Sequence, residues 1–363
     1  MQSLIPVFID ITEWNKIPYS STGGTRAKNI YVFPKDEKEY FFKGSKKLPD
    51  GTFKYPTEFW SEIVASKVGQ MLGFNLLNYE IGYDVNDEQQ IGCLSKSMVE
   101  HTENKLSEGV DFLRGFDSSY NPKKDEKRYT LEFIKKALTY FELSDFLPHF
   151  IEMLIFDAII GNSDRHQENW GFISKFRETI REIDKEITNT RGFFARIEPK
   201  LRKFLTKNAL KQREIQELKN TAPNKILLKT QSQIVETVFS PIYDSGCCLG
   251  RELEDKRIKL MLKDSQMIEA FIKRGRSEIR WNAGSKPKHF DFLNDISQEY
   301  PEVFKKVLEK IKSNFDKEKL RQLIDNIDVN LPLELKRFSL TNNRKLLMHK
   351  LVTLRIEKLF EFT

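Results

Sequence analysis

Three polar side chains have the types and the spacing that phosphoryl transfer requires. Asp164 and Asn169 stand five positions apart in a polar stretch after an apolar run, and Asp244 follows a second apolar segment. A carboxylate can accept or orient an attacking hydroxyl, while a carboxamide oxygen and a second carboxylate can bind Mg²⁺. The three residues therefore predict a site that uses ATP and Mg²⁺.

Each part of this set also has a simpler interpretation. The stretch from Asp164 to Asn169 can be a polar turn between a helix and a strand, whose side chains bond local backbone groups. The segment Asp244-Ser245-Gly246 suits a turn at the end of a strand. Neither stretch decides the matter alone, and their order along the chain is more informative than either.

A stretch rich in glycine and hydroxyl residues lies near the N-terminus, between two expected strands. Glycines let backbone N–H groups approach phosphate oxygens, and hydroxyls and basic groups add donors. The residues that we expect to contact the nucleotide there are Ser21, Gly23, Gly24, Thr25 and Lys28. A Gly-Gly hairpin turn is the competing interpretation.

Lys43 follows the strand-like triplet 40–42 and is the predicted ligand of the α- and β-phosphates. Glu62, in the helix expected next, is the candidate ion-pair partner of Lys43. Glu58 lies one turn earlier on a similar face and competes for that role. The alternative for any single member is an exposed lysine or a solvated glutamate.

The order of apolar segments predicts an α+β protein with two lobes. We expect strands at residues 4–11, 29–33, 39–43, 78–83 and 90–98, with one helix over 59–72. Farther along, helices are expected at residues 130–141, 147–160, 252–274, 298–313, 317–327 and 342–361. The predicted domains are a β-rich N-lobe at 1–105 and a helical C-lobe at 106–363.

A basic segment interrupts the predicted C-lobe. Residues 175–229 hold 15 Lys/Arg against 7 Asp/Glu, a net charge of +8, while the whole chain carries +7. Apolar residues at helical spacing predict a helical insertion there. The segment suits contact with RNA, DNA or an acidic partner, and a solvated helical face is the alternative.

Composition excludes several classes of protein. No run of about 18 or more apolar residues occurs, so we expect no membrane-spanning helix. The N-terminus has no basic region before an apolar core, so no secretory signal is expected. Cys93, Cys247 and Cys248 lack the number for a disulfide framework and the spacing of a zinc site. A reducing cytoplasm is the expected compartment.

These motifs together resemble those of the HipA family of bacterial kinases, from about residue 18 onward. The family's catalytic loop reads like Asn-x-Asp-x-His-x-x-Asn, which matches residues 162–169, and its metal-binding aspartate lies in a Pro-x-Tyr-Asp stretch, which matches 241–244. The resemblance implies a bilobal, protein-kinase-like fold and Ser/Thr protein kinase activity. It places the nucleotide-binding lysine and its helix glutamate at Lys43 and Glu62. His166 is expected to orient the loop by hydrogen bonds.

The resemblance also implies regulation and partners. In that family, autophosphorylation of a Gly-loop serine can inactivate the enzyme; Ser21 fits best here, with Ser20 and Thr22 as alternatives. Family members are often toxins that a small DNA-binding antitoxin neutralises, and some act on a translation-related protein. Full-length members carry a subdomain before the Gly-rich loop; this loop begins near residue 20, so we expect a short form.

Two other functions remain open at this stage. A lipid or small-molecule kinase on the same fold would use the same residues, and a basic face near the cleft would suit an anionic headgroup. A catalytically inactive kinase-fold module could use the basic segment for binding. The presence of Lys43, Asp164, Asn169 and Asp244 favours an active enzyme.

Overall fold

The computed structural model of the chain describes residues 4–17, 29–100, 104–175 and 236–362. The chain divides into two compact units. The first unit comprises Met1–Met98, Pro148–Asn169 and Pro241–Thr363, and the second comprises Val99–Leu147 and Trp170–Ser240. These units do not follow the predicted lobes 1–105 and 106–363, and that lobe boundary stays a prediction.

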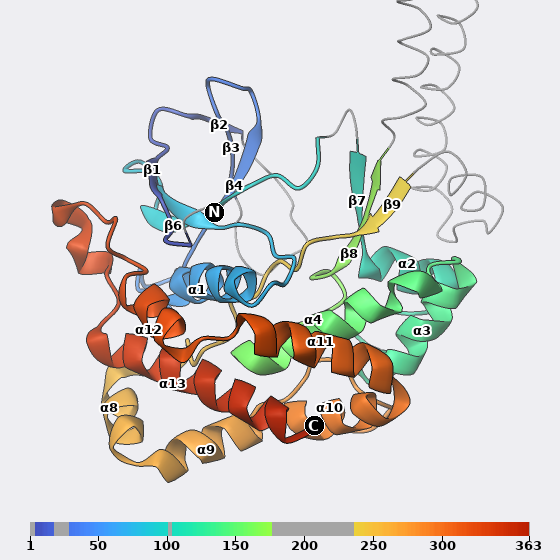
Figure 1. The fold of residues 1–363 in the computed structure, drawn as a ribbon. Helices are drawn as coiled ribbons and strands as arrows, with labels where there is room; N and C mark the ends of the chain where they lie inside the picture. The colour runs from blue at the N-terminus through green and yellow to red at the C-terminus, as the bar shows by residue number, and fades with distance from the viewer. Residues whose placement is uncertain (1–3, 18–28, 101–103, 176–235, 363) are drawn as a thin grey trace, which may run out of the picture. The chain divides into compact units, whose positions relative to one another are not determined.

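A six-stranded sheet forms the N-terminal part of the first unit (Figure 1). Its strands follow the order β1-β5-β6-β4-β3-β2, and every neighbouring pair is antiparallel except β1 and β5. The strands are β1 (Phe8–Asp10), β2 (Asn15–Ile17), β3 (Asn29–Val32), β4 (Glu39–Gly44), β5 (Glu80–Tyr83) and β6 (Ile91–Lys96).

Aromatic residues fill one face of this sheet. Tyr31 on β3 and Phe42 on β4 are fully buried, and their rings meet edge to face at 5.9 Å between centroids. The Tyr31 hydroxyl donates to Asp84 Oδ2 at 2.7 Å, which satisfies the buried polar end of the ring. Alternation along β4 sends Phe42 to this core, and its neighbour Lys43 to the opposite face.

Helix α1 (Glu58–Met71) contacts β4 and β6. Helix α4 (Leu147–Ile160) is mostly apolar and is buried from Phe150 onward, apart from half-buried Glu152. Gly69 allows close packing here, because a Cβ at this position would lie 2.2 Å from Leu76 Cδ1 and 2.9 Å from Phe156 Cε2. The two helices thereby fix the elements that carry the predicted catalytic residues.

The C-terminal helices complete the first unit, and α13 contacts α8, α9 and α12 (Figure 1). They are α8 (Asp255–Lys263), α9 (Ser265–Arg274), α10 (His289–Glu299), α11 (Pro301–Asn314), α12 (Lys317–Asp325) and α13 (Asn342–Leu359). Helix α1 also contacts α12, and Trp60 Nε1 donates to the Phe338 carbonyl at 2.8 Å. The N-terminal sheet and the C-terminal helices therefore share one unit.

The second unit contains a three-stranded antiparallel sheet in the order β7-β8-β9. Trp170 is buried and donates from Nε1 to the Tyr129 hydroxyl at 2.8 Å. The elements are β7 (Asn104–Glu108), α2 (Gly109–Phe116), α3 (Leu131–Tyr140), β8 (Gly171–Lys175) and β9 (Glu236–Phe239).

The predicted α+β, kinase-like fold class is confirmed, while several element boundaries differ. The single helix expected over 252–274 is two helices, because the Asp264 side chain accepts from Gln266 N and caps α9. The elements β2, β7, β8, α2 and α10 were not predicted. Residues 176–229 of the predicted insertion lie outside the described part of the chain.

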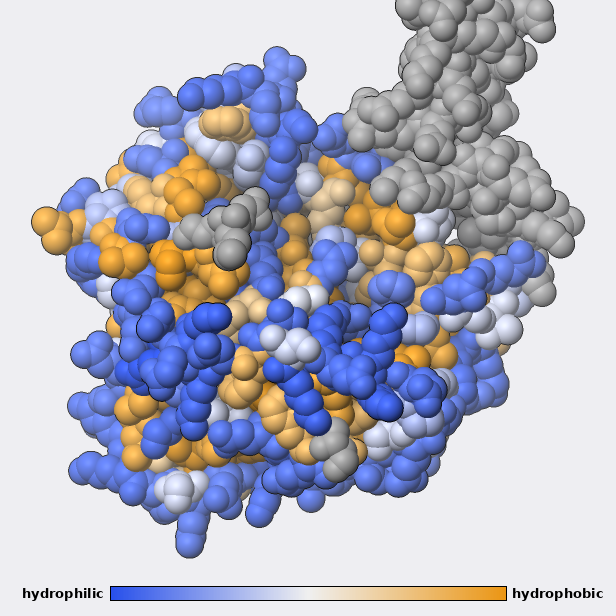
Figure 2. All heavy atoms as spheres, in the orientation of Figure 1, coloured by the Kyte–Doolittle hydropathy of each residue, from blue (hydrophilic) through white to orange (hydrophobic). Residues whose placement is uncertain are grey.

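Polar side chains cover much of the face shown in Figure 2, with apolar groups between them. Large apolar side chains that remain exposed among the described residues include Val7, Leu260 and Leu333. No described helix combines the length and the apolar character that a membrane crossing needs.

Candidate active site

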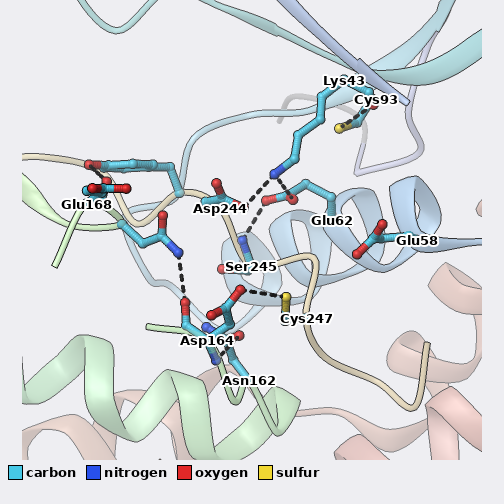
Figure 3. Close-up of polar contacts among 12 residues, drawn as sticks. Lys43, Glu58, Glu62, Cys93, Asn162, Asp164, Glu168, Asp244, Ser245 and Cys247 are labelled. Atoms are coloured by element: carbon cyan, nitrogen blue, oxygen red, sulfur yellow. Dashed lines mark hydrogen bonds and ion pairs between the residues drawn. The ribbon is translucent and has the colours of Figure 1, made fainter. Parts of the chain in front are cut away.

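Lys43 lies where three segments of the first unit meet. It is paired with Cys93 in the β4–β6 register, and the residue is only 7% exposed. Its Nζ atom lies 3.3 Å from Glu62 Oε2 on α1 and 2.5 Å from Asp244 Oδ1 (Figure 3). A buried ammonium needs opposite charge around it, and two carboxylates supply that charge.

Glu62, and not Glu58, is the carboxylate that pairs with Lys43. Its second oxygen, Oε1, accepts from the backbone N–H of Ser245 at 2.6 Å, so Glu62 contacts both Lys43 and the segment that carries Asp244 (Figure 3). Glu58 instead pairs with Arg251, whose guanidinium lies over the Tyr55 ring at 4.7 Å. The two glutamates, one turn apart, thus serve different partners.

Asp244 has an unusual backbone conformation. Its φ of 52° is in the left-handed region, which costs free energy for a residue other than glycine. The segment before it is anchored to the loop after α1, since Ile242 N donates to Asn75 O and Leu77 N donates to Ile242 O. These bonds hold the carboxylate beside Lys43 despite the strained backbone.

Tyr79 adds a buried group next to Asp244. The backbone N–H of Asp244 lies 3.4 Å from the Tyr79 hydroxyl oxygen. Burial raises the pKa of Tyr79 well above its ordinary value, and the charges of Glu62, Cys93 and Asp244 raise it further. The phenol therefore stays neutral and can fill space beside the carboxylates without adding charge.

Asn169 and Asp164, the two residues predicted to act in the catalytic loop, each form a hydrogen bond within the first unit. Asn169 is buried and donates from Nδ2 to the Asp164 carbonyl at 2.7 Å. None of the described residues donates to Asn169 Oδ1. Asp164 is partly exposed, and its Oδ2 accepts from the Cys247 thiol at 3.0 Å (Figure 3). His166 Nδ1 accepts from Glu168 N at 3.3 Å within the loop.

Arg165 and Asp157, which were not among the predicted site residues, connect the predicted catalytic loop to the Asp244 segment. Both side chains are buried, and Arg165 donates from Nε and Nη2 to the two Asp157 oxygens at 2.9 and 2.7 Å. Arg165 Nη1 also donates to the carbonyls of Asn169 at 2.9 Å and Tyr243 at 2.5 Å, and Nη2 donates to Ser245 Oγ at 3.1 Å. One guanidinium therefore fixes both segments.

The local sequence contained a signal for this pair. Asp157 is the only charged residue in the apolar run 153–160, and a charge in a buried helix requires a partner. Asn162 supplies a third member, because its Nδ2 donates to Asp157 Oδ1 at 2.9 Å. Arg165, 8 positions after Asp157, is the nearest positive charge along the sequence.

The two adjacent cysteines have different surroundings. Cys247 contacts the Asp164 carboxylate, while Cys248 is fully enclosed near the Ser61 carbonyl. Burial raises the pKa of the Cys248 thiol well above its usual value, and the Glu62 charge acts in the same direction. Cys248 is therefore a packing residue with an unreactive thiol.

The described residues fit a Mg²⁺–nucleotide complex. Asn169 Oδ1 and the Asp244 carboxylate are hard oxygen ligands, and Mg²⁺ in kinases takes its other ligands from phosphates and water. The strained backbone of Asp244 is an observation that supports a functional role. The predicted contacts Ser21, Gly23, Gly24, Thr25 and Lys28 lie outside the described residues, as do Ser20 and Thr22.

Comparison with solved structures identifies a related architecture. The chain matches the crystal structure of a Helicobacter pylori proinflammatory kinase, CtkA, with a TM-score of 0.67 over 98% of this chain and 96% of that one. The chain has a kinase fold. Identity with CtkA is 20%, so the likeness concerns the fold. No protein-family model and no curated protein sequence matches the chain.

The buried Arg165–Asp157 pair gives a stability prediction. Replacement Arg165→Met leaves the Asp157 carboxylate buried without its bidentate partner, which should lower the free energy of unfolding by about 3–5 kcal/mol. Urea denaturation measures the loss. Arg321→Met is the matched control, because the Arg321–Asp325 pair is about one-third exposed and should contribute about 0–1 kcal/mol. Equal losses in the two variants would contradict the role of Arg165.

His289 predicts a pH dependence of stability. The imidazole is buried at the start of α10 and hydrogen-bonds the backbone of Asn162. Burial lowers the pKa of His289 to about 3, and the Arg355 charge acts in the same direction. Its ordinary pKa is 6.5, so between pH 6.5 and 3 only the unfolded chain binds the proton. Stability should fall with falling pH in that window, by about 2 kcal/mol from pH 7 to 5 for this group.

Urea denaturation at pH 7 and pH 5 checks this dependence. The variant His289→Gln should lose less stability between the two pH values than the unmodified protein. His149→Gln, at an exposed position on α4, controls for the loss of an imidazole elsewhere. A pH dependence that is identical in His289→Gln and the unmodified protein would contradict the assignment.

Proposed function

We propose that the chain is an ATP- and Mg²⁺-dependent Ser/Thr protein kinase of the HipA type. The observation that carries the proposal is the position of Lys43 Nζ between Glu62 and Asp244, at 3.3 and 2.5 Å. A lysine held by a helix carboxylate and next to a predicted metal-binding aspartate is the arrangement that kinases use for nucleotide phosphates. The kinase fold is consistent with it.

Each residue has a distinct part in the proposed reaction. Lys43 would contact the α- and β-phosphates, with Glu62 holding the ammonium in place. Asn169 and Asp244 would hold Mg²⁺, which when bound neutralises charge on the β- and γ-phosphates. Asp164 would orient the acceptor hydroxyl and take its proton. The thiol of Cys247, 3.0 Å from Asp164 Oδ2, would restrict the orientation of that carboxylate.

Regulation and partners follow from the same proposal. Autophosphorylation in the Gly-rich loop, with Ser21 as the candidate, would displace the nucleotide contacts. The protein substrate would be a translation-related protein or another bacterial cytoplasmic protein, and an antitoxin or other regulator would control the activity. Contact of residues 175–229 with nucleic acid remains a separate proposal.

The variant Asp164→Ala tests the proposed chemistry. Loss of the acceptor base should reduce phosphoryl transfer from labelled Mg-ATP by about 10²–10⁴-fold, with little change in the free energy of unfolding, because Asp164 is partly exposed. Label incorporation located by mass spectrometry is the measurement. Glu168→Gln, a carboxylate replacement in the same loop, is the control and should keep most of the transfer.

Three outcomes separate the functions considered. Label on Ser21 or on an added protein supports the Ser/Thr protein kinase. Label on lipid or a small molecule alone would replace that proposal with a kinase of another substrate class. Full transfer by Asp164→Ala, or no transfer by the unmodified protein to any acceptor, would contradict the proposed mechanism.

A further inference from the structure

A cavity of about 430 Å³ lies beside the catalytic loop, within the first unit. Its polar lining comes from six residues, Ser163, Cys247, Glu252, Arg274, Arg276 and Arg355. Ser163 precedes the proposed catalytic base, and the Cys247 thiol bonds to the carboxylate of that base at 3.0 Å. A group bound in this cavity would therefore lie next to the acceptor side of the active site.

Arg355 is a buried cation at the wall of this cavity. The residue is 2% exposed, and its Nη1 donates to the Ala158 carbonyl at 3.0 Å, while Nε is buried without a hydrogen-bond partner among the described residues. Gly161 and Gly275 leave room around Nη2 of Arg355. A Cβ atom at Gly161 would lie 2.6 Å from this nitrogen, and a Cβ atom at Gly275 would lie 3.2 Å from it. Both glycines line the cavity.

Arg355 is paired with no carboxylate among the residues that the structure describes. Burial lowers its pKa to about 10, so the guanidinium is still charged at neutral pH. The Glu252 charge acts in the opposite direction and raises this pKa, but it does not offset the effect of burial. A buried guanidinium that is only partly compensated by opposite charge is unfavourable. An anion in the cavity would reduce that cost, and this is the main indication of the ligand's charge.

Two exposed arginines add to the positive charge of the cavity. Arg274 Nε donates to the Ala270 carbonyl at 3.0 Å, and Arg276 Nη1 donates to the Lys286 carbonyl at 2.5 Å. Within the described part of the chain, neither forms an ion pair. Glu252 is the one carboxylate in the lining, so three guanidinium groups face one negative charge.

We propose that this cavity binds an oxyanion-bearing side chain of the protein substrate, close in sequence to the acceptor hydroxyl. A carboxylate or a phosphorylated hydroxyl matches the fork of guanidinium donors. The volume falls in the range of small-ligand sites and admits a side chain. The substrate class is thus an acidic or previously phosphorylated peptide segment. This inference rests on the proposed protein kinase function and names its substrate preference.

Peptide pools with a central serine test the preference. Each pool carries Glu, phosphoserine or Gln at one fixed flanking position and mixed residues elsewhere. With labelled Mg-ATP, the unmodified protein should label a Glu or phosphoserine pool about tenfold more than the matching Gln pool at one position. The Glu and phosphoserine pools distinguish the two sources of the anion.

Charge reversal at the cavity should remove this preference. In the double variant Arg274→Glu/Arg276→Glu, the acidic and Gln pools should be labelled equally, or the Gln pool should be preferred. Lys273→Glu is the matched control, because Lys273 is exposed on the same helix and does not line the cavity. It should keep the preference for the anionic pool.

A binding measurement without ATP separates failure of this inference from failure of the proposed function. Fluorescence anisotropy should show tighter binding of the preferred anionic pool than of the Gln pool, with the difference lost in the double variant only. The inference would be overturned if transfer or binding showed no preference for the anionic pools over the Gln pool. It would also be overturned if that preference survived in the double variant. Absence of transfer to any pool would contradict the kinase proposal, and anisotropy would still decide whether the cavity binds anions.

Discussion

The buried contact between Arg165 and Asp157 is the interaction on which the site depends. Asp157 lies on a helix that is buried almost throughout, and a carboxylate there requires a charged and well-oriented partner. Arg165 meets that requirement and uses its remaining donors on the carbonyls of Asn169 and Tyr243. Core packing of α4 thereby sets the relative position of the proposed catalytic loop and the segment that carries Asp244.

Lys43 makes the corresponding connection on the nucleotide side. Its ammonium group contacts Glu62 and Asp244, while Glu62 also accepts from the Ser245 backbone. Hydrogen bonds on both sides hold the left-handed backbone of Asp244. Before it, Ile242 N donates to Asn75 O; after it, Ser245 N donates to Glu62 and Ser245 Oγ accepts from Arg165. Charge pairing within the first unit therefore organises the groups that kinase chemistry would require.

Sequence periodicity was sufficient for the fold class and for the longest elements. The bounds of α4 were predicted correctly because apolar residues predominate along it and Gly161 follows directly. By contrast, β2 and β7 are short and polar and depend on strand pairing that sequence periodicity does not report. Motif spacing selected Lys43, Glu62, Asp164, Asn169 and Asp244. It missed Arg165, whose bonds to Tyr243 and Ser245 span 78 and 80 positions, and the Arg355 cavity, which forms only when distant helices pack.

The central claim is that Lys43, Glu62 and Asp244 form a site for the phosphates of a nucleotide. Calorimetric titration with ATP is its most direct test. The titration is done with and without Mg²⁺, on the unmodified protein and on Asp244→Asn. We predict that Mg²⁺ strengthens ATP binding to the unmodified protein and that most of this effect is lost in Asp244→Asn, because the replacement removes a charged oxygen ligand. Equal ATP affinity with and without Mg²⁺ in the unmodified protein, or no ATP binding at all, would contradict the claim.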